Sequence, residues 1–423
     1  MKIWVVTQYF KPEYGSVQSR VHGFAKIWQK DGHNVTIFTA TPHHKPQDNT
    51  KTLEYRKASK IFKEKYDGLE VYRHKTKLIR SRKFGSKFRS QLSFALGMLS
   101  HLNRSEHKKN APDIILATSP SILCCLSAYF LAKKLNAKFI FEVRNLLPDT
   151  HLASRTIKHD SFYARILTKI SHFLYKNADA VTVLSVSMAK ALFYRGVPKK
   201  KIFLVYDGIP DEFLDNADRS KHSLKATSIR NNLQIHPMTK IVMFLGVHST
   251  KQGLGQILET AKILLSRNDI IFLMVGGGED KPRLMNMAKG MPNIKFLDSV
   301  DDAEVFGYYA CADILLVPHR DSTDISLHIP MKLFEILATR TPAIACVSGE
   351  AKQLVEEADA ATVVEPENPQ KLSAAIIKTF ENYEGAKLQA QKGPEYVATK
   401  FRQSMLARQY IAIANKTIKT NKK

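Results

Sequence analysis

The feature that most constrains the fold is a repeated alternation of short apolar runs with longer amphipathic stretches. In the first cycle, strand-sized runs at residues 2–7 and 34–39 flank a stretch in which apolar residues recur at helical spacing. The apolar residues of that stretch are Val21, Phe24, Ala25 and Trp28. Strands that alternate with helices predict a parallel, doubly wound α/β sheet.

The same alternation continues along the chain and is interrupted once. In the first half, further strands are expected at residues 113–117, 138–143, 179–184 and 202–205. In the second half, strands are expected at residues 240–246, 270–275, 294–297, 313–317, 342–346 and 361–364. A polar stretch at residues 207–238 separates the halves, and we interpret it as an interdomain connection.

The alternation therefore predicts two α/β domains, at residues 1–206 and 239–394, which agrees with a length of 423 residues. Residues 395–423 are expected to form a final helix, from about 395 to 414 by periodicity, and a Lys-rich tail. We expect this helix to pack back toward the first domain. Ligands of such sheets bind beyond the carboxyl ends of the strands, so two facing domains place the site in a central cleft.

Positive charge is concentrated in the first domain. Residues 1–206 contain 37 Lys and Arg against 13 Asp and Glu, a formal charge of +24, whereas residues 207–423 contain 27 against 26. A general enrichment of lysine in the source proteome is the alternative explanation, but it would raise the charge of both halves. The asymmetry therefore favours a surface that faces a polyanion. The candidates are an anionic membrane surface, a nucleic acid and an anionic acceptor.

A basic segment of this domain, Lys83 to Asn103, has the pattern of an interfacial amphipathic helix. Apolar residues recur in it at helical spacing, and basic residues crowd its beginning. The apolar residues are Phe84, Phe88, Leu92, Ala95, Leu99 and Leu102, and the basic ones are Arg80, Arg82, Lys83, Lys87 and Arg89. Such a helix either docks on lipid or packs its apolar stripe on the domain core, and the pattern leaves both open.

Composition excludes several function classes. The four cysteines lack metal-ligand spacing, which argues against a zinc site and a disulfide scaffold and favours buried thiols in a reducing cytosol. No apolar run is long enough to span a membrane or to form a signal-peptide core. We therefore expect a cytoplasmic protein, peripheral on the inner face of the cell membrane.

Three glycine-containing loops follow expected strands and precede expected helices. They are the Gly15–Ser16 turn, the loop at 244–253 with Lys251 and Gln252, and the triple glycine around Gly277. Backbone amides at a helix start bind anions, and glycine lets a ligand approach the backbone closely. Each loop is equally compatible with a turn that binds nothing. The spacings match neither a Walker loop nor a dinucleotide fingerprint.

The segment 324–338 has the most specific pattern. Pro330 suits the first turn of a helix, so the preceding amides are expected at its positive end. These amides belong to Leu327, His328 and Ile329. Lys332 adds a full charge, and Glu335 follows on roughly the same face, where its carboxylate suits the hydroxyls of a ribose. This is the arrangement expected for a nucleotide sugar, and a surface Lys–Glu pair is the alternative.

Together, these segments resemble the family 4 glycosyltransferases of the GT-B fold over nearly the whole chain. The matching segments are 32–36 (Gly-His-Asn-Val-Thr), 141–148 (Phe-Glu-Val-Arg-Asn-Leu-Leu-Pro), 180–185, 195–198, 246–253, the loop at 276, 312–313 and 330–335 (Pro-Met-Lys-Leu-Phe-Glu). The branch that the chain resembles is that of the bacterial amino-sugar transferases of surface polysaccharide assembly.

The resemblance implies retaining, metal-independent transfer of a hexosyl or N-acetylhexosaminyl group from a nucleoside diphosphate sugar to a lipid-linked or glycan acceptor, with no cofactor. Lys332 and Glu335 would be the catalytic pair: Lys332 neutralises the leaving diphosphate together with Lys251 and the amides near His328, and Glu335 grips the ribose. The same donor site would include Gln252, Gly277, Leu327 and Ile329, with Ser299 and Val300 at the base.

In the first domain, the resemblance implies that Gly15 and Ser16 approach the diphosphate or the transferred sugar. Arg144 and Asp149 are the candidate acceptor-side residues. A sugar-nucleotide 2-epimerase has a similar architecture and is the alternative enzyme. A nucleic-acid binder would use the basic half, but no binding motif or aromatic platform accompanies the charge.

Overall fold

The computed structural model describes residues 1–13, 15–42, 55, 60–77, 84–101, 110–149, 152, 157, 161–320, 322 and 327–419. The chain divides into two compact units. The first unit comprises Met1–Asp207 and Gln403–Lys423, and the second comprises Gly208–Arg402.

The first unit is built on a mixed but mostly parallel sheet. Its described strands are β1 (Lys2–Val6), β2 (Asn34–Ala40), β3 (Ile61–Tyr66), β4 (Leu69–His74), β5 (Ile114–Thr118), β6 (Lys138–Val143), β7 (Ala180–Val183) and β8 (Ile202–Leu204). They lie in the order β3-β4-β2-β1-β5-β6-β7-β8, and β3 alone among them runs antiparallel to its neighbour. The strand order reverses between β1 and β5, and the carboxyl ends of these strands form the edge where such sheets bind ligands.

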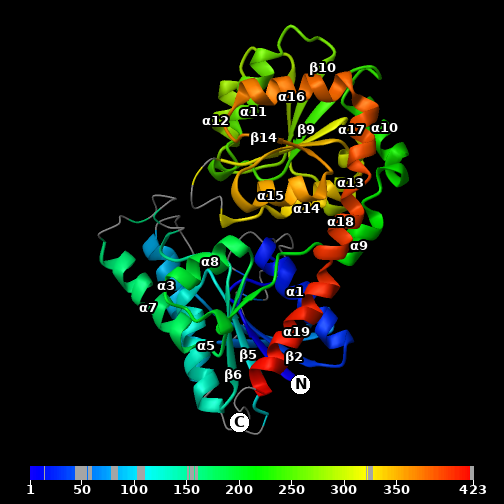
Figure 1. Ribbon diagram of the computed structural model, residues 1–423. Helices are drawn as coiled ribbons and strands as arrows, with labels where there is room; N and C mark the ends of the chain where they lie inside the picture. Colours follow the sequence, from blue (N-terminus) through cyan, green and yellow to red (C-terminus); the bar gives the residue numbers. More distant parts are fainter. Residues whose placement is uncertain are drawn as a thin grey trace. The chain divides into compact units, whose positions relative to one another are not determined.

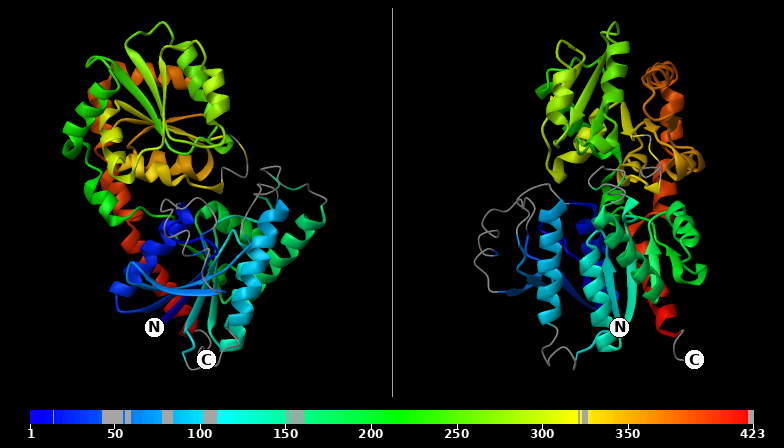
Figure 2. Two further views of the ribbon diagram at one scale, coloured as in Figure 1. Left: turned by 180° about the vertical axis from the view of Figure 1, so that it is seen from behind. Right: turned by 90° about the vertical axis from the view of Figure 1, so that its left-hand side faces the viewer.

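Helices cover both faces of this sheet (Figures 1 and 2). The described helices are α1 (Ser16–Lys30), α3 (Phe84–His101), α5 (Ile122–Leu135), α7 (Phe162–Asn177), α8 (Val186–Tyr194), η1 (Lys199–Lys201) and α19 (Gln403–Lys419). α1 and α19 share one face and its core, whereas α3, α5 and α7 pack side by side on the other. The apolar stripe predicted for α1 is confirmed, because all four of its residues are buried.

The edge hairpin of β3 and β4 was not among the predicted strands. Its turn is Asp67-Gly68, in which both residues have positive φ, 48° and 81°. Asp-Gly between two strand-sized runs is a strong hairpin signal, because both central residues of a type I′ turn need positive φ. The signal is present in the sequence, but residues 61–74 were not assigned to strands.

The structure changes the interpretation of the basic amphipathic helix, of which residues 78–83 and 102–103 lie outside the described residues. The buried side of α3 is made by Ser90, Phe94 and Met98, together with Ala95. Two residues of the predicted stripe, Leu92 and Leu99, are exposed to 41% and 37%, and Leu96 is exposed to 58%. The side of α3 that carries Leu92, Leu96 and Leu99 therefore does not pack on the core. The core contacts are made by the side that carries Ser90, Phe94 and Met98.

The second unit contains a parallel sheet. Its described strands are β9 (Lys240–Leu245), β10 (Ile270–Val275), β11 (Ile294–Leu297), β12 (Ile314–Pro318), β13 (Ala343–Cys346) and β14 (Thr362–Val364). Their order is β11-β10-β9-β12-β13-β14, so the switch point lies between β9 and β12. All twelve predicted strands of the two units are confirmed, with ends that differ by at most one residue.

Helices also cover both faces of the second sheet. The described helices are α9 (Asp211–Asn216), η2 (Arg219–His222), α10 (Ser223–Asn232), η3 (Thr250–Gln252), α11 (Gly255–Ile263), α12 (Lys281–Met287), α13 (Asp302–Cys311), α14 (Met331–Leu337), α15 (Gly349–Ala358), α16 (Pro369–Glu381), α17 (Tyr383–Ala390) and α18 (Gly393–Lys400). α11, α12 and α16 share the core of one face, and α14 and α15 lie on the other (Figure 1).

Residues 208–238 belong to the second unit and do not form a free connection. They fold into α9, η2 and α10, and α10 packs on α13. Arg230 of α10 donates to the carbonyl of Cys311 at 2.9 Å and to Asp313 at 2.7 Å. The polar composition that suggested a linker is that of surface helices held by such contacts.

The predicted final helix is two helices, α18 and α19, which belong to different units. Between them, Phe401 is fully buried and stacks on Phe334 with ring centroids 4.0 Å apart. Arg402 then forms a parallel β-bridge with Ile209. The helix ends because the backbone at this point pairs with a strand-like segment, which periodicity alone does not reveal. No helix among the described residues is long and apolar enough to cross a membrane.

Candidate active site

The carboxyl ends of β9, β10 and β12 in the second unit bring several predicted donor-site residues together. The loops after β9 and β10 lie against each other, since the His248 amide donates to the Gly277 carbonyl at 2.9 Å. A Cβ on Gly276 would lie 2.0 Å from the Gly246 carbonyl oxygen, and φ of Gly276 is 136°. The triple glycine therefore allows the loops after β9 and β10 to pack against each other, and does not serve only to let a ligand approach.

Gly277 and Ser299 are neighbours in this structure. A Cβ on Gly277 would lie 3.1 Å from the Ser299 hydroxyl, so the loops after β10 and β11 also meet at this edge. The Ser299 side chain is exposed and Val300 is partly buried. The predicted base-binding residues thus flank the glycine loop, as a contiguous site requires.

Lys332 and Glu335 form a hydrogen-bonded triad with Tyr309. The Lys332 ammonium lies 2.8 Å from Glu335 Oε2 and 2.8 Å from the Tyr309 hydroxyl, and Tyr309 donates to the same carboxylate oxygen at 3.0 Å. Lys332 Cε lies 3.7 Å from the Cβ position of Gly246, at the end of β9. The side chain of Lys332 therefore reaches the switch point of the sheet from α14.

The triad is partly buried, and its charges support one another. Burial alone would raise the pKa of Glu335, but the ammonium of Lys332 outweighs it and holds the pKa below its ordinary value. Burial opposes the charge of Lys332, whose pKa is nevertheless raised by Glu335 and Tyr309. Lys332 and Glu335 are therefore both charged at neutral pH.

The residues before α14 lie beside the end of β12. Pro330 is the N-cap of α14, and Leu327, His328 and Ile329 are partly buried. Burial, with a smaller contribution from His328, lowers the pKa of His319 to about 4, so His319 is neutral at physiological pH. Residues 321 and 323–326 lie outside the described residues.

Lys251 and Gln252 form the short turn η3 after β9. The Lys251 side chain is exposed, and Gln252 is partly buried. The next residue, Gly253, has a φ of 61°, and a Cβ there would lie 3.2 Å from the Arg320 Cα and the His319 carbonyl. The turn is thus fixed against the end of β12. A donor contact of Lys251 stays a prediction.

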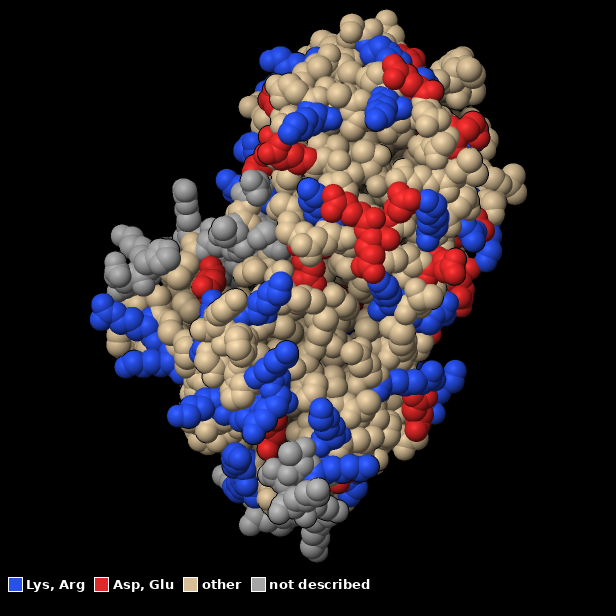
Figure 3. Space-filling view, in the orientation of Figure 1, with Lys and Arg blue, Asp and Glu red and all other residues tan. Residues whose placement is uncertain are grey.

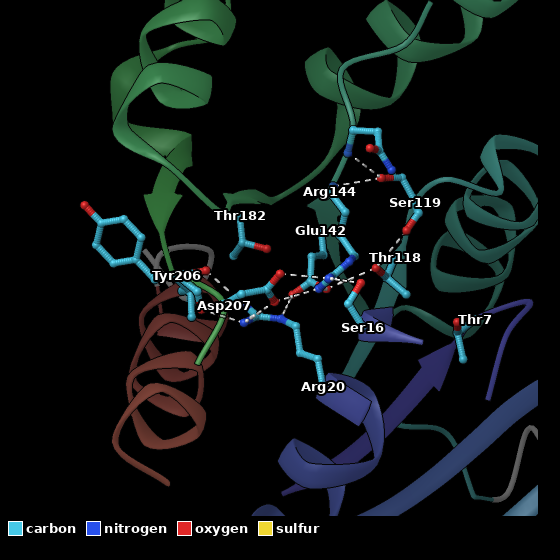
Figure 4. Close-up of polar contacts among 12 residues, drawn as sticks. Thr7, Ser16, Arg20, Thr118, Ser119, Glu142, Arg144, Thr182, Tyr206 and Asp207 are labelled. Atoms are coloured by element: carbon cyan, nitrogen blue, oxygen red, sulfur yellow. Dashed lines mark hydrogen bonds and ion pairs between the residues drawn. The ribbon is translucent and has the colours of Figure 1, made fainter. Parts of the chain in front are cut away.

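In the first unit, the predicted residues Ser16 and Arg144 meet in a buried network of ion pairs (Figure 4). Arg144 donates to both carboxylate oxygens of Asp207, at 2.9 Å each, and to the Ser16 hydroxyl at 3.2 Å. Arg20 donates to Glu142 and to Asp207, both at 3.2 Å. The side chains of Arg20, Glu142 and Arg144 are exposed to 5% or less.

The network is closed by backbone and hydroxyl partners. Arg20 also donates to the carbonyls of Val205, at 3.1 Å, and Tyr206, at 2.5 Å, while Thr118 donates to Glu142 at 3.0 Å. Burial lowers the pKa of Arg20, but Glu142 and Asp207 outweigh this and raise it. Two cations and two anions are thus held in the interior with their hydrogen bonds made.

The structure corrects the predicted role of Arg144. Its guanidinium is buried and bound to Asp207 and Ser16, so it does not present an exposed face to an acceptor. Asp149 accepts a hydrogen bond from Arg195 at 2.8 Å and is exposed to 40%. Its contact with an acceptor stays a prediction.

Gly15 has the expected place, as the N-cap of α1 with a φ of 155°. Residues with a side chain rarely adopt this φ, so the turn favours glycine. Ser16, the first residue of α1, is exposed. The α1 amides and the Ser16 hydroxyl lie together at the carboxyl edge of the first sheet.

Sequence reasoning missed Tyr309, Arg20, Glu142 and Asp207. Tyr309 lies 23 residues from Lys332, and Asp207 lies 187 from Arg20, so no local spacing links them. A charged residue inside an apolar strand, as Glu142 in β6, is one available signal, because such a group needs a buried partner. The described residues contain no group of three or more His, Cys, Asp and Glu that could hold a metal ion, and the four cysteines are buried and free.

Comparison with protein families gives two matches. Residues 15–208 match the glycosyl transferase 4-like domain, and residues 239–382 match the glycosyl transferases group 1. A putative colanic acid biosynthesis glycosyl transferase, WcaI of Escherichia coli K12, is 26% identical over 390 residues, 89% of this chain and 91% of WcaI. The probable glycosyltransferase WbjE of Pseudomonas aeruginosa is 21% identical and covers 64% of this chain and 66% of its own length.

Solved structures show the same fold. A sucrose-phosphate synthase from Thermosynechococcus elongatus has a TM-score of 0.75 at 16% identity, with 99% of both chains covered. HepE of Anabaena in complex with UDP has a TM-score of 0.72 at 13% identity, covering 98% of this chain and all of its own. These are GT-B glycosyltransferases, whose two parallel-sheet α/β domains correspond to the two units. With transferase models matched over both units, the chain is a glycosyltransferase and belongs to family 4.

Proposed function

We propose that the protein is a retaining glycosyltransferase that moves a sugar from a nucleoside diphosphate sugar to a lipid-linked or glycan acceptor in surface polysaccharide synthesis. The observation that carries this proposal is the Lys332–Glu335–Tyr309 triad beside Gly246 at the end of β9. The names of WcaI and of the UDP complex of HepE support the substrate class. Epimerisation is not favoured, because both matched models are those of transferases.

Lys332 would stabilise the diphosphate as the bond to the sugar breaks. An ammonium has three donors, and two of them are bound to Glu335 and Tyr309 in the described structure. The third would reach a phosphate oxygen, and the amides before α14 would add their dipoles. These groups provide the charge compensation, so we propose that transfer needs no metal ion. Turnover should then persist in excess EDTA, and a loss restored by Mg²⁺ would contradict this part.

Glu335 would hold the ribose through its second carboxylate oxygen. Both triad hydrogen bonds go to Oε2, which leaves Oε1 for the hydroxyls of the nucleotide. Hydrogen bonds to a charged group contribute about 1.5–3 kcal/mol, so Glu335→Ala should weaken nucleotide binding at least tenfold, by roughly 1.4 kcal/mol per factor of ten. The triad is thus both the phosphate clamp and the ribose clamp of the proposed donor site.

A thermal-shift panel of nucleoside diphosphates and sugar nucleotides tests the donor site. A ligand at 100 times its Kd stabilises the folded protein by about 2.7 kcal/mol, which is a clear rise in Tm. We expect one class of nucleotide to give this rise in the wild type and in Tyr309→Phe, whereas a tenfold weaker affinity in Glu335→Ala should cut the stabilisation to about 1.4 kcal/mol, roughly half, at the same ligand concentration. Tyr309→Phe is the control because it loosens the same triad without removing the ribose ligand. No shift with any nucleotide would contradict the proposal.

We further propose that the helices α3, α5 and α7 form a docking face for an anionic membrane. The three helices contain seven Lys and Arg and no Asp or Glu. They also expose apolar side chains: Leu92, Leu96, Leu99, Phe130, Phe162, Tyr163 and Phe173. Figure 3 shows Lys and Arg gathered over the α5 and α7 region with few acidic side chains among them. A cationic and apolar face suits the interface of a membrane that carries anionic lipids.

Sedimentation with vesicles tests the docking face. Each basic residue near an anionic surface contributes about 1 kcal/mol, so replacing Arg165 and Lys169 by Gln should weaken binding to phosphatidylglycerol vesicles roughly thirtyfold. Leu96→Ser should also weaken it, whereas Leu388→Ser, which changes an even more exposed leucine of α17, should not. Equal binding to anionic and zwitterionic vesicles, or equal effects of the two leucine variants, would contradict this face.

A further inference from the structure

The buried ion-pair network of the first unit connects the end of that unit to the start of α1. Asp207 is the last residue of the first unit before the chain enters the second. Its carboxylate binds Arg144 with two hydrogen bonds of 2.9 Å, and Arg144 binds the Ser16 hydroxyl at 3.2 Å (Figure 4). Two contacts therefore separate Asp207 from the first residue of the helix whose amino end carries the Gly15–Ser16 turn.

The partners of the network come from three separate parts of the chain. Arg20 lies in α1, Glu142 in β6, Arg144 just after β6, and Asp207 three residues after β8. Arg20 shares Asp207 Oδ1 with Arg144 and also binds Glu142. The Arg144 guanidinium is thus held by Asp207 and lies 3.9 Å from Glu142, and its Nη2 also donates to Ser16, which is exposed.

Stability alone is a weak reason for such a network. Four charged side chains in an interior lose their hydration, and apolar residues of similar volume often stabilise a fold equally well or better. What a network of this kind provides is a single geometry, because each guanidinium fork fits its carboxylates in one orientation. The exposed end of this rigid set is the Ser16 hydroxyl.

We propose that Asp207 and Arg144 are positioning residues for glycosyl transfer, which hold the Ser16 hydroxyl and the first turn of α1 in the orientation that the reaction needs. This inference rests on the proposed function, in which Ser16 approaches the diphosphate or the transferred sugar. Arg20 and Glu142 hold Arg144 and Asp207 in turn. None of the four needs to touch a substrate, since the contact is made by Ser16.

A double-mutant cycle on turnover tests the coupling. The substrate is the sugar nucleotide that the thermal-shift panel selects, and the readout is release of its nucleoside diphosphate. We expect Ser16→Ala to lower kcat about tenfold and Asp207→Asn at least as much, with the KM of the donor changed less than threefold. If Asp207 acts through Ser16, the double variant should lose no more than the worse single variant. Independent losses that multiply to about a hundredfold would overturn the proposal.

Asp179→Asn is the matched control. Asp179 lies in the same unit, at the opposite edge of the sheet, and its carboxylate accepts from the Phe139 amide at 3.0 Å and from Lys138 at 3.4 Å. Its loss should lower Tm and leave kcat within twofold. Asp207→Asn removes the negative partner of two buried arginines, so this variant can fail to fold. Arg144→Lys therefore provides a second double-mutant cycle with Ser16→Ala. Lysine keeps the charge but lacks the fork that reaches both Asp207 and Ser16.

Hydrogen–deuterium exchange provides a readout that needs no substrate. Arg144→Lys and Asp207→Asn should raise exchange of the first hydrogen-bonded amides of α1, at residues 19–22, at least fivefold relative to the wild type, and Asp179→Asn should not. Unchanged exchange at α1 would overturn the positioning role even if turnover falls. A wild type that turns over no sugar nucleotide would contradict the proposed function instead, and the exchange experiment would still decide whether Asp207 and Arg144 hold the α1 turn.

Discussion

Removing the Tyr309 hydroxyl perturbs the candidate donor site without changing its shape. Tyr309 is 1% exposed, and its hydroxyl accepts from Lys332 at 2.8 Å and donates to Glu335 at 3.0 Å. In Tyr309→Phe both hydrogen bonds are lost, but the Lys332–Glu335 pair remains, so neither charge is left without a partner. The variant therefore measures how much the hydroxyl of Tyr309 contributes to stability.

The expected cost follows from these contacts. A hydrogen bond to a charged group contributes about 1.5–3 kcal/mol, and part of the loss of two is offset because the remaining pair relaxes. We expect the free energy of unfolding to fall by about 2–3 kcal/mol. For a domain of the size of the second unit, about 1 kcal/mol corresponds to 2–4 °C, so Tm should fall by roughly 4–12 °C.

Calorimetry with Tyr308→Phe as the control makes the test specific. Tyr308 lies on the same helix, and the described structure gives its hydroxyl no hydrogen bond, so its loss should shift Tm by less than about 2 °C. Because buried Tyr309 cannot contact a nucleotide, the affinity of Tyr309→Phe for the selected nucleoside diphosphate should stay within about threefold. If Tyr309→Phe had the same Tm as Tyr308→Phe, the triad would be refuted. A large loss of nucleotide affinity in Tyr309→Phe would refute the inference that Tyr309 supports the triad without binding the nucleotide.

Three further predictions concern packing and pH. Gly276→Ala should lower the free energy of unfolding by at least about 3 kcal/mol in denaturant unfolding, because its Cβ would lie 2.0 Å from the Gly246 carbonyl oxygen at a φ of 136°. Gly290→Ala is the control and should lower it by about 1–2 kcal/mol, since Gly290 has a φ of 79° and nothing within 4 Å of its Cβ position. Equal losses in the two variants would refute the loop contact. Burial lowers the pKa of His319 from its ordinary 6.5 to about 4, so the unfolded chain binds more protons between these pH values, and this contribution to stability is complete above pH 6.5 and lost as pH falls toward 4. His319→Gln should therefore remove about 2–3 kcal/mol of the pH-dependent loss measured by urea unfolding at pH 7 and pH 4, and an unchanged slope would contradict the burial of the ring. Trp28→Phe should cost about 2–3 kcal/mol, because the indole of Trp28 is buried and donates to the Ala407 carbonyl of α19 at 2.8 Å, and a neutral result would show that this contact does not hold α19 to α1.

Sequence reasoning located the parts of the fold whose signal is local. Each predicted strand is a short apolar run between turns, so its ends are marked by the residues themselves, and periodicity identified the buried stripe of α1. For α3, periodicity left lipid docking and core packing open; Leu92 and Leu99 of the predicted stripe are exposed, and the core contacts belong to Phe94 and Met98. A helix with apolar residues on more than one face does not specify which face a neighbour covers.

The candidate donor site was predicted only in part, because part of it depends on contacts between distant segments. Lys332 and Glu335 are one helical turn apart, so their pairing was visible as an alternative, but the partner that completes the triad comes from α13. Arg144 was selected from a motif and assigned to an acceptor. Its burial, and its contacts with Asp207 and Ser16, depend on strands that meet only in the folded sheet.

By itself, the sequence determined the alternation of strands and helices, the two α/β units and the residues at their strand ends, because each of these depends on neighbours within a few positions. The tertiary structure alone decided which charged groups become buried partners, which face of α3 stays exposed, and where the chain leaves α18 to pair Arg402 with Ile209. The physical reason is that hydrophobic periodicity is a property of a segment. The partner of a buried charge depends instead on which strand ends become adjacent, and that order is established only when the sheet is assembled.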